Sequence, residues 1–284
     1  MPKISVIMPV HNTKKEWLIE SIESILNQTF TDFEFIIIDD SSTNEQFNVI
    51  KQYNDKRIIY YKLEPISLPQ ALNYGFNIAN GEYIARMDAD DISLPKRFEK
   101  QIKLLDAQKD ISIVGSFYET FPEKQIITFP KYPKCLDFIL GCCIAHPTVM
   151  LRKSDFQKYN LKYRDDYFCE DYDLWSRAIK YLNFYNLQEK LLYYRYSTEN
   201  KSNLNLIKLE QDTKNVKDNI LNFLTEDKAF QENLKEILWG TNNKSVTLWE
   251  KLFSIDVKYS QLKKHTIIRL LGLKISIKGG INCN

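Results

Sequence analysis

Short, β-rich apolar runs alternate with helical patterns through residues 1–117, and this alternation constrains the fold more than any other feature. The runs are nearly continuous in apolar residues, as in strands that are buried on both faces, and apolar residues recur at helical spacing between them. Strands that alternate with helices form right-handed crossovers, so we expect an α/β fold with a mainly parallel sheet and helices on both faces. The predicted strands are Ile4–Met8, Phe33–Ile38, Ile58–Lys62, Tyr83–Met87 and Ile111–Phe117, and the predicted helices are Trp17–Gln28, Leu68–Asn80 with Gly81 as its cap, and one that opens at Pro95.

The second half of the chain is less regular. Residues 121–147 hold four of the nine prolines and predict loops with short elements. Beyond them we expect strands at Thr148–Arg152 and Leu191–Tyr196, a helix at Tyr172–Tyr181, and a helical region from Asn203 to about Leu238.

Charge and composition exclude several classes of protein. A formal net charge of +2 is too small to predict nucleic acid as the main partner. No apolar run approaches the ~18–20 residues of a membrane-spanning helix, and Pro9 interrupts the first apolar run before it reaches the length of a signal peptide. Five cysteines without a C-x-x-C pair disfavour a disulfide framework or a zinc site, and they predict the reducing cytosol.

Polar residues follow three of the predicted strands. Pro9-Val10-His11-Asn12 ends the first, Asp39-Asp40 ends the second, and Arg86-Met87-Asp88-Ala89-Asp90-Asp91 ends the fourth. Open α/β sheets bind ligands at the carboxyl ends of their strands, so we expect the three segments to border one cleft. Taken singly, His11 and Asn12, or Asp39 and Asp40, can equally be turn residues.

The third segment predicts a metal site. Three carboxylates within four residues repel one another unless a cation lies among them. Oxygen ligands suit Mg²⁺ or Mn²⁺, which proteins usually hold through one or two carboxylates plus substrate phosphates. We therefore interpret Asp88 and Asp90 as metal ligands, whereas Asp91 can equally cap the helix that follows. The first 74 residues contain no glycine, which excludes a P-loop and a dinucleotide-binding loop.

A second acidic group, Glu170, Asp171 and Asp173, lies at the start of the predicted helix at Tyr172–Tyr181. Acids in a first helical turn interact favourably with the helix dipole, which is one explanation of the group. The other is that Glu170 or Asp171 acts as a general base, because a carboxylate within hydrogen-bond reach can take a proton from a hydroxyl.

Together and in this order, the motifs resemble those of a family 2 glycosyltransferase over roughly residues 1–200. The resemblance implies a GT-A fold, a nucleotide-sugar donor, an inverting mechanism and a divalent cofactor, Mn²⁺ or Mg²⁺. It implies a catalytic domain at 1–200, with a nucleotide-sugar part at about 1–117 and an acceptor part at about 118–200, then a helical extension at 201–250 and a basic tail at 251–284. The matching segments are Ile4–Asn12, Ser24–Phe30, Ile38–Thr43, Leu72-Asn73, Gly81–Asp91, Pro95–Arg97, His146–Met150 and Glu170–Trp175.

The resemblance also implies roles for single residues. Asp171 matches the catalytic base, Glu170 would contact the acceptor, and Asp90 and Asp88 would bind the metal. His146 would face the diphosphate or the acceptor, although a lone histidine before proline is more often structural. The residues that would bind the nucleotide sugar are Pro9, His11, Asn12, Asp39, Asp40 (which would hold the base), Asn73, Arg86, Asp88, Ala89 and His146.

Basic residues dominate the tail at 251–284, which contains a single acid, Asp256. Such a tail either packs as a hairpin with a solvated basic face or contacts an anionic membrane surface, at about 1 kcal/mol per basic residue. Similar ends occur in bacterial lipooligosaccharide glycosyltransferases. The resemblance therefore implies a UDP-sugar donor of hexose or N-acetylhexosamine, a lipid-linked or oligosaccharide acceptor, and a cytoplasmic, peripheral location at the inner membrane. The alternatives are a sugar-nucleotidyltransferase and an inactive sugar-nucleotide-binding subunit.

Overall fold

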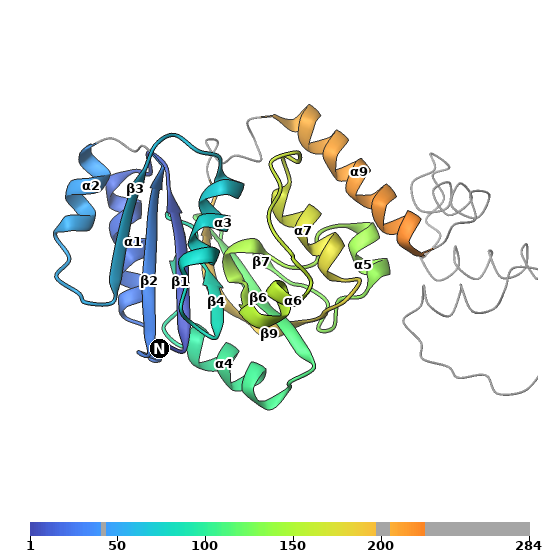
Figure 1. Ribbon diagram of the computed structural model, residues 1–284, viewed down its shortest axis with the longest axis horizontal. Helices are drawn as coiled ribbons and strands as arrows, with labels where there is room; N and C mark the ends of the chain where they lie inside the picture. The colour runs from blue at the N-terminus through green and yellow to red at the C-terminus, as the bar shows by residue number, and fades with distance from the viewer. Residues whose placement is uncertain (41–43, 197–204, 225–284) are drawn as a thin grey trace, which may run out of the picture.

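The structure is a computed structural model that describes residues 1–40, 44–196 and 205–224, and its centre is a mixed β-sheet (Figure 1). The strands are β1 (Ile4–Val10), β2 (Phe33–Asp40), β3 (Ile58–Leu63), β4 (Tyr83–Arg86), β5 (Ile92–Ser93), β6 (Ile111–Phe121), β7 (Ile126–Ile127), β8 (Met150–Arg152) and β9 (Asn183–Arg195). Their order in the sheet is β3-β2-β1-β4-β8-β6-β9-β5, and β7 pairs with β6.

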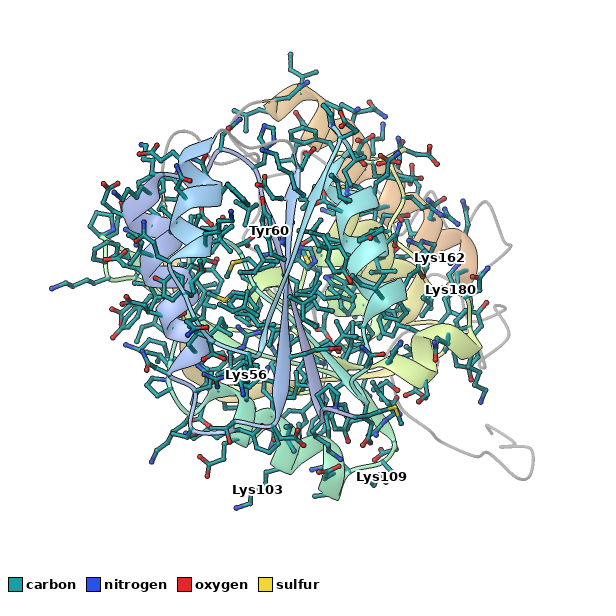
Figure 2. The ribbon with its side chains drawn as sticks, turned by 60° about the vertical axis from the view of Figure 1, so that its left-hand side comes forward. Lys56, Tyr60, Lys103, Lys109, Lys162 and Lys180 are labelled. Carbon is teal, nitrogen blue, oxygen red and sulfur yellow. The ribbon has the colours of Figure 1, made fainter. Side chains whose placement is uncertain are left out.

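Helices cover both faces of the sheet, and each face has its own hydrophobic core (Figure 2). Because successive strand residues point to opposite faces, Val6 and Met8 of β1 lie in one core and Ile7 lies in the other. The first core is closed by α1 (Lys15–Leu26), α2 (Asn44–Lys51) and α4 (Arg97–Ala107). The second is closed by α3 (Leu68–Ile78), α5 (Cys135–Leu140), α6 (Lys153–Lys158), α7 (Glu170–Ala178) and α9 (Leu206–Leu224), and the 3₁₀ turn η1 (His146–Thr148) precedes β8.

The predicted α/β fold is confirmed, and the sheet is parallel from β3 through β2 and β1 to β4 and again between β6 and β9. β8 lies between β4 and β6 and runs antiparallel to both. Antiparallel neighbours need no helical crossover, and this is why the loop-rich residues 121–147 can lead into β8. The sequence pattern did not indicate β5, α2 or α6, which are short, and it predicted only the end of β9.

Two predicted helix boundaries were wrong. Gly81 does not cap α3, which ends at Ile78 with Ala79 as an extended C-cap. A Cβ atom at Gly81 would lie 2.4 Å from the backbone nitrogen of Ser5, so the close approach of β1 explains the glycine. Pro95 does not open α4 either, because that helix begins at Arg97.

The last part of the sequence is described only in part. α9 falls within the predicted helical region, whose remainder and the predicted basic tail at 251–284 lie outside the described residues. No helix in the described ranges is both long enough and apolar enough to cross a membrane.

Candidate active site

The three polar segments predicted to border one cleft lie at neighbouring strand ends. β1 pairs with β2 on one side, where Val10 is opposite Asp39, and with β4 on the other, where Ile7 is opposite Arg86. All three strands are parallel, so the residues that follow them leave the sheet at one edge. The topology therefore confirms the predicted juxtaposition. Within it, Pro9 is half-buried, whereas the Ala89 side chain is buried in the core beneath the edge.

The two aspartates at the end of β2 have different surroundings. Asp39 is fully buried, and its carboxylate accepts a hydrogen bond of 2.5 Å from the hydroxyl of Tyr60 on β3, labelled in Figure 2. Burial and this carboxylate both raise the pKa of Tyr60. Asp40 accepts a hydrogen bond of 2.7 Å from the Ile66 backbone, and its other carboxylate oxygen lies 3.3 Å from Nδ1 of His11.

His11 lies at the open side of this group. Its side chain is 64% exposed, and its Nδ1 is 2.9 Å from the backbone carbonyl oxygen of Asp40. The next residue, Asn12, has a φ of 49°, a left-handed conformation that asparagine tolerates better than most residues. The turn after β1 therefore presents His11 and Asn12 beside Asp40 at the sheet edge.

Asp88, Asp90 and Asp91 bring one carboxylate oxygen each to within 4.8 Å of one another. Asp88 also forms an ion pair with Arg86, whose Nε is buried and has no hydrogen-bond partner. Burial and the Asp88 carboxylate raise the pKa of Asp90 to about 6, and burial with both neighbouring carboxylates raises the pKa of Asp91 well above its usual range.

The donor set of this group fits a hard divalent cation. Oδ2 of Asp91 is buried and has no hydrogen-bond partner, and crowded carboxylates favour their charged forms only when a positive charge lies among them. Three carboxylates offer the all-oxygen ligands that Mg²⁺ and Mn²⁺ prefer.

Side chains from three separate elements hold the backbone of this segment at alternate residues. Arg97 of α4 donates a hydrogen bond of 2.6 Å to the Arg86 carbonyl, and Ser21 of α1 donates one of 2.8 Å to the Asp88 carbonyl. Arg195, the last residue of β9, donates one of 2.8 Å to the Asp90 carbonyl. No sequence pattern had indicated Ser21 or Arg195, and Arg97 was predicted only as part of a matching motif.

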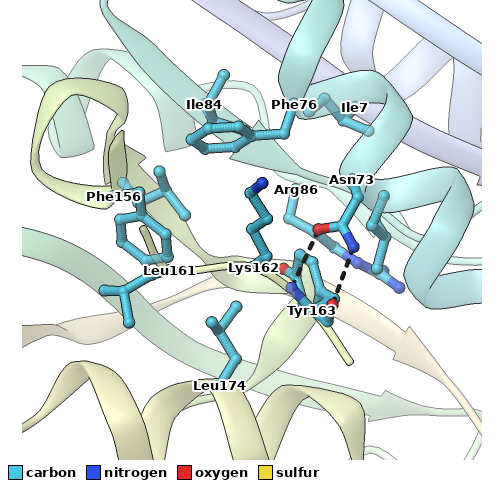
Figure 3. Close-up of a pocket in the computed structure, with 12 residues that line it drawn as sticks. Ile7, Asn73, Phe76, Ile84, Arg86, Phe156, Leu161, Lys162, Tyr163 and Leu174 are labelled. Atoms are coloured by element: carbon cyan, nitrogen blue, oxygen red, sulfur yellow. Dashed lines mark hydrogen bonds between the residues drawn. The ribbon is translucent and has the colours of Figure 1, made fainter. Parts of the chain in front are cut away.

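A loop at residues 161–164 connects this group to α3 and η1. Asn73 of α3 donates a hydrogen bond of 2.9 Å to the Tyr163 carbonyl and accepts one of 3.0 Å from the Tyr163 backbone nitrogen (Figure 3). The Tyr163 hydroxyl lies 2.8 Å from Nε2 of His146. Asn73 and His146, which were predicted to bind the nucleotide sugar, thus hold Tyr163 in place, and Tyr163 lines a small cavity together with Arg86.

The Tyr163 hydroxyl feels the charges of both predicted acidic groups. Burial raises the pKa of its hydroxyl, the positive charge of Arg86 opposes this, and the charges of Asp171, Glu170 and Asp88 add to it. The metal-binding candidates and the candidate base therefore both influence one phenol electrostatically. No pattern in the sequence had indicated Tyr163.

The acids at the start of α7 differ in how they are held. Glu170 is buried, and Asp173 is buried in an ion pair of 2.6 Å with Arg177. Asp171 is half-buried, and its Oδ1 accepts a hydrogen bond of 2.7 Å from the backbone of Tyr172. Among these three acids, Asp171 is therefore the one with a partly accessible carboxylate.

The segment after β4 thus collects carboxylates and a buried arginine, and the start of α7 presents Asp171. Such an arrangement can bind a cation and an anionic group together and can take a proton from a nearby hydroxyl.

Sequence comparison identifies the family. The model described as Glycosyl transferase family 2 matches residues 5–169. The chain is 41% identical over 207 residues to the O-antigen biosynthesis glycosyltransferase WbnJ of Escherichia coli, an alignment that covers 68% of this chain and 79% of WbnJ.

Solved structures share the fold. S. aureus TarS 1-349, solved in complex with UDP-GlcNAc, matches with a TM-score of 0.66 at 17% identity and covers 95% of this chain and 80% of the TarS chain. The mannosyltransferase PcManGT from Pyrobaculum calidifontis, in complex with GDP-Man and Mn²⁺, matches with a TM-score of 0.56 at 13% identity and covers 95% of this chain and 85% of its own. The chain therefore belongs to glycosyl transferase family 2 and is a glycosyltransferase with the GT-A fold.

Proposed function

We propose that this protein is an inverting, metal-dependent glycosyltransferase that transfers a hexose or N-acetylhexosamine from a UDP-sugar to a sugar acceptor. The observation that carries the proposal is the convergence of the Asp88, Asp90 and Asp91 carboxylates to within 4.8 Å, beside the buried Arg86. The family assignment decides against the alternative of a sugar-nucleotidyltransferase, which is a different class of enzyme.

A divalent cation, Mn²⁺ or Mg²⁺, would be held by Asp88 and Asp90, and it would supply charge neutralisation for the leaving nucleoside diphosphate. The complex of PcManGT with GDP-Man and Mn²⁺ supports this choice. Arg86 adds positive charge to the same end of the site, and its partnerless Nε can donate to a phosphate oxygen.

The donor would lie along the sheet edge. Asp40, with Asp39 behind it, would hold the base, and Pro9, His11 and Asn12 would line the nucleotide pocket. Ala89 would contribute backbone rather than side chain, because its side chain is buried in the core. Asn73 and His146 would act through Tyr163, whose backbone and hydroxyl they hold. TarS in complex with UDP-GlcNAc supports a UDP-sugar as the donor.

Asp171 would be the general base, and Glu170 would contact the acceptor. A half-buried carboxylate can remove the proton from an acceptor hydroxyl while that oxygen attacks the anomeric carbon. Attack on the face opposite the leaving diphosphate inverts the configuration of the sugar.

The acceptor would be lipid-linked or a free oligosaccharide in the assembly of a bacterial lipooligosaccharide or other surface glycan. The name of WbnJ, an O-antigen biosynthesis glycosyltransferase, supports this setting. In this proposal residues 1–200 form the catalytic domain, which divides near residue 117 into a donor part and an acceptor part. Residues 201–250 extend this domain. The basic tail at 251–284 contacts an anionic membrane at the cytoplasmic face.

The direct test is a donor screen. The purified protein is mixed with UDP-glucose, UDP-galactose, UDP-GlcNAc or UDP-GalNAc, with Mn²⁺ or with EDTA, and thermal stability and UDP release are measured. A donor at 100 times its dissociation constant should stabilise the fold by about 2.7 kcal/mol, in Mn²⁺ only.

The test variant is Asp90→Ala, which should lose the Mn²⁺-dependent increase in thermal stability. The matched control is Asp110→Ala, which should keep this increase because Asp110 is exposed and lies away from the site. Equal stabilisation with Mn²⁺ and with EDTA would contradict the metal dependence. A product with retained anomeric configuration, determined by NMR, would contradict the inverting mechanism.

A further inference from the structure

Arg195 contacts the aspartate segment at two adjacent residues, Asp90 and Asp91. Its Nε donates a hydrogen bond of 2.8 Å to the Asp90 carbonyl, and its backbone nitrogen donates one of 2.8 Å to Oδ1 of Asp91. The two partners are 105 and 104 residues away in the sequence, so the contacts exist only because β9 ends next to this segment. One residue thus contacts two of the three aspartates whose carboxylates converge here.

The Arg195 side chain is itself held firmly. Its guanidinium lies 5.0 Å from the ring centre of Trp17 and 5.1 Å from that of Phe121, and it forms an ion pair with Glu20 of α1. The residue is 8% exposed. A planar guanidinium can stack on aromatic rings and still donate in fixed directions, which an ammonium group cannot do.

The fold connects β9 to the aspartate segment in a second way that does not use this side chain. Ile92 and Ser93 of β5 pair with Tyr193 and Leu192 of β9, and the Leu94 nitrogen donates a hydrogen bond of 2.9 Å to the Leu191 carbonyl. These backbone contacts keep the strands together when the guanidinium is changed. Removal of the guanidinium should therefore loosen the Asp90 backbone specifically, without separating β9 from the sheet.

We propose that Arg195 is a positioning residue that holds the Asp90 backbone and the Asp91 carboxylate, and so keeps the aspartate group in the arrangement that binds the divalent cation. The inference rests on the proposed function, because it assumes that this group binds a metal. The stacked guanidinium holds the Asp90 carbonyl, and Glu20 and the two rings hold the guanidinium. Groups that orient metal ligands in this way typically contribute 10–100-fold to metal affinity.

The test measures Mn²⁺ binding by the full-length protein in the presence of UDP. Binding is monitored through the loss of the EPR signal of the free ion. Arg195→Lys keeps the positive charge and the backbone contact to Asp91 but loses the donor to Asp90, so the Mn²⁺ dissociation constant should rise about tenfold. Glu20→Gln leaves that donor in place and weakens only its support, so a rise of about two- to threefold is expected.

The matched control is Arg57→Lys. Arg57 also lies over an aromatic ring, 4.5 Å from the centre of Phe33, and donates to a backbone carbonyl at Leu26 and to a carboxylate at Asp55. It lies just before β3, at the opposite edge of the sheet from the aspartate segment, so this variant should bind Mn²⁺ like the wild type. The melting temperature of this variant shows how much stability is lost when a stacked arginine is replaced by lysine.

The outcomes separate the inference from the function on which it rests. Wild-type protein that binds no Mn²⁺ with UDP overturns both. Wild-type binding together with an unchanged dissociation constant in Arg195→Lys overturns only the role of Arg195. If the melting temperature of Arg195→Lys is far below that of Arg57→Lys, the Glu20→Gln variant decides the question. A raised Mn²⁺ dissociation constant in Glu20→Gln supports the inference, and an unchanged one overturns it.

Discussion

At the scale of single residues, the most telling contrast is among the acids of α7. Glu170 is buried and Asp173 is paired with Arg177, whereas Asp171 is half-buried. We predict that Asp171→Asn lowers the turnover number at least 10²-fold, because an amide cannot accept the proton of the acceptor hydroxyl. Donor affinity, measured by calorimetry with UDP-sugar and Mn²⁺, should stay within about twofold of wild type.

The control for Asp171→Asn is Asp166→Asn, because Asp166 is an exposed aspartate in the turn that precedes the same helix. Its turnover number should be that of the wild type. Near-wild-type turnover in Asp171→Asn would remove Asp171 from the role of base.

Asp90 gives a second prediction at this scale, concerning pH. Its pKa is raised to about 6 by burial and by Asp88, so between about pH 4 and pH 6 the folded protein holds a proton that the unfolded chain releases. The free energy of unfolding of the metal-free protein should therefore fall as pH rises through this window. Asp90→Asn should be more stable than wild type by about 1–3 kcal/mol at pH 7.5, and the difference should vanish near pH 4.

Urea unfolding of both proteins in EDTA across this pH range measures the Asp90 effect. A difference between variant and wild type that does not change with pH would show that Asp90 titrates normally in the folded state. Excess Mn²⁺ with UDP should stabilise the wild type and leave the variant unchanged.

At the scale of elements, α9 supports the loop that leads into α7. It packs Val216, Ile220 and Leu221 into the second core, and the Asp212 carboxylate accepts a hydrogen bond of 2.7 Å from the Phe168 backbone. We predict that Asp212→Ala costs about 1–3 kcal/mol, because it removes the hydrogen bond that the Phe168 N–H donates to this carboxylate. Turnover should fall about tenfold through displacement of Asp171, while Mn²⁺-dependent donor affinity should not change.

Lys214→Ala serves as the control on the same helix, because Lys214 is exposed. Kinetic constants and donor binding are measured for both variants. A loss of donor affinity in Asp212→Ala would mean that α9 supports the whole site rather than the base alone.

At the scale of the whole molecule, β8 joins β4 to β6 and so makes the sheet continuous. Leu151 of β8 lies opposite Ile84 of β4 and Ile113 of β6, and it is 4% exposed. Leu151→Ala should lower the free energy of unfolding by about 2–5 kcal/mol. Because the sheet is continuous, we expect one cooperative transition in which fluorescence and circular dichroism change together in urea, as in the wild type.

The control for Leu151→Ala is Leu206→Ala, because Leu206 is 64% exposed. This variant should change the free energy of unfolding by less than about 0.5 kcal/mol. Two separate transitions in Leu151→Ala would instead show that the parts of the sheet on either side of β8 unfold independently.

The parts of the fold that the sequence predicted are those with strong local patterns. The parallel strands β1 to β4 were predicted because each is a short apolar run and these runs alternate with helical patterns along the chain. β5, α2 and α6 were missed because a short element carries too few residues for a period to be read. The antiparallel direction of β8 was also missed, because strand direction depends on where the chain crosses the sheet and not on the residues of the strand.

The α/β class, the first strands and the acids at their ends could be predicted from the sequence, because side-chain periodicity and strand-end chemistry depend on neighbouring residues. The contacts that hold the site in place could not: Arg195 holds Asp90 and Asp91, and Asn73 and His146 hold Tyr163. Hydrogen bonds reach only about 3 Å, so a contact between residues a hundred positions apart depends on how the whole sheet and its two cores bring their backbones together.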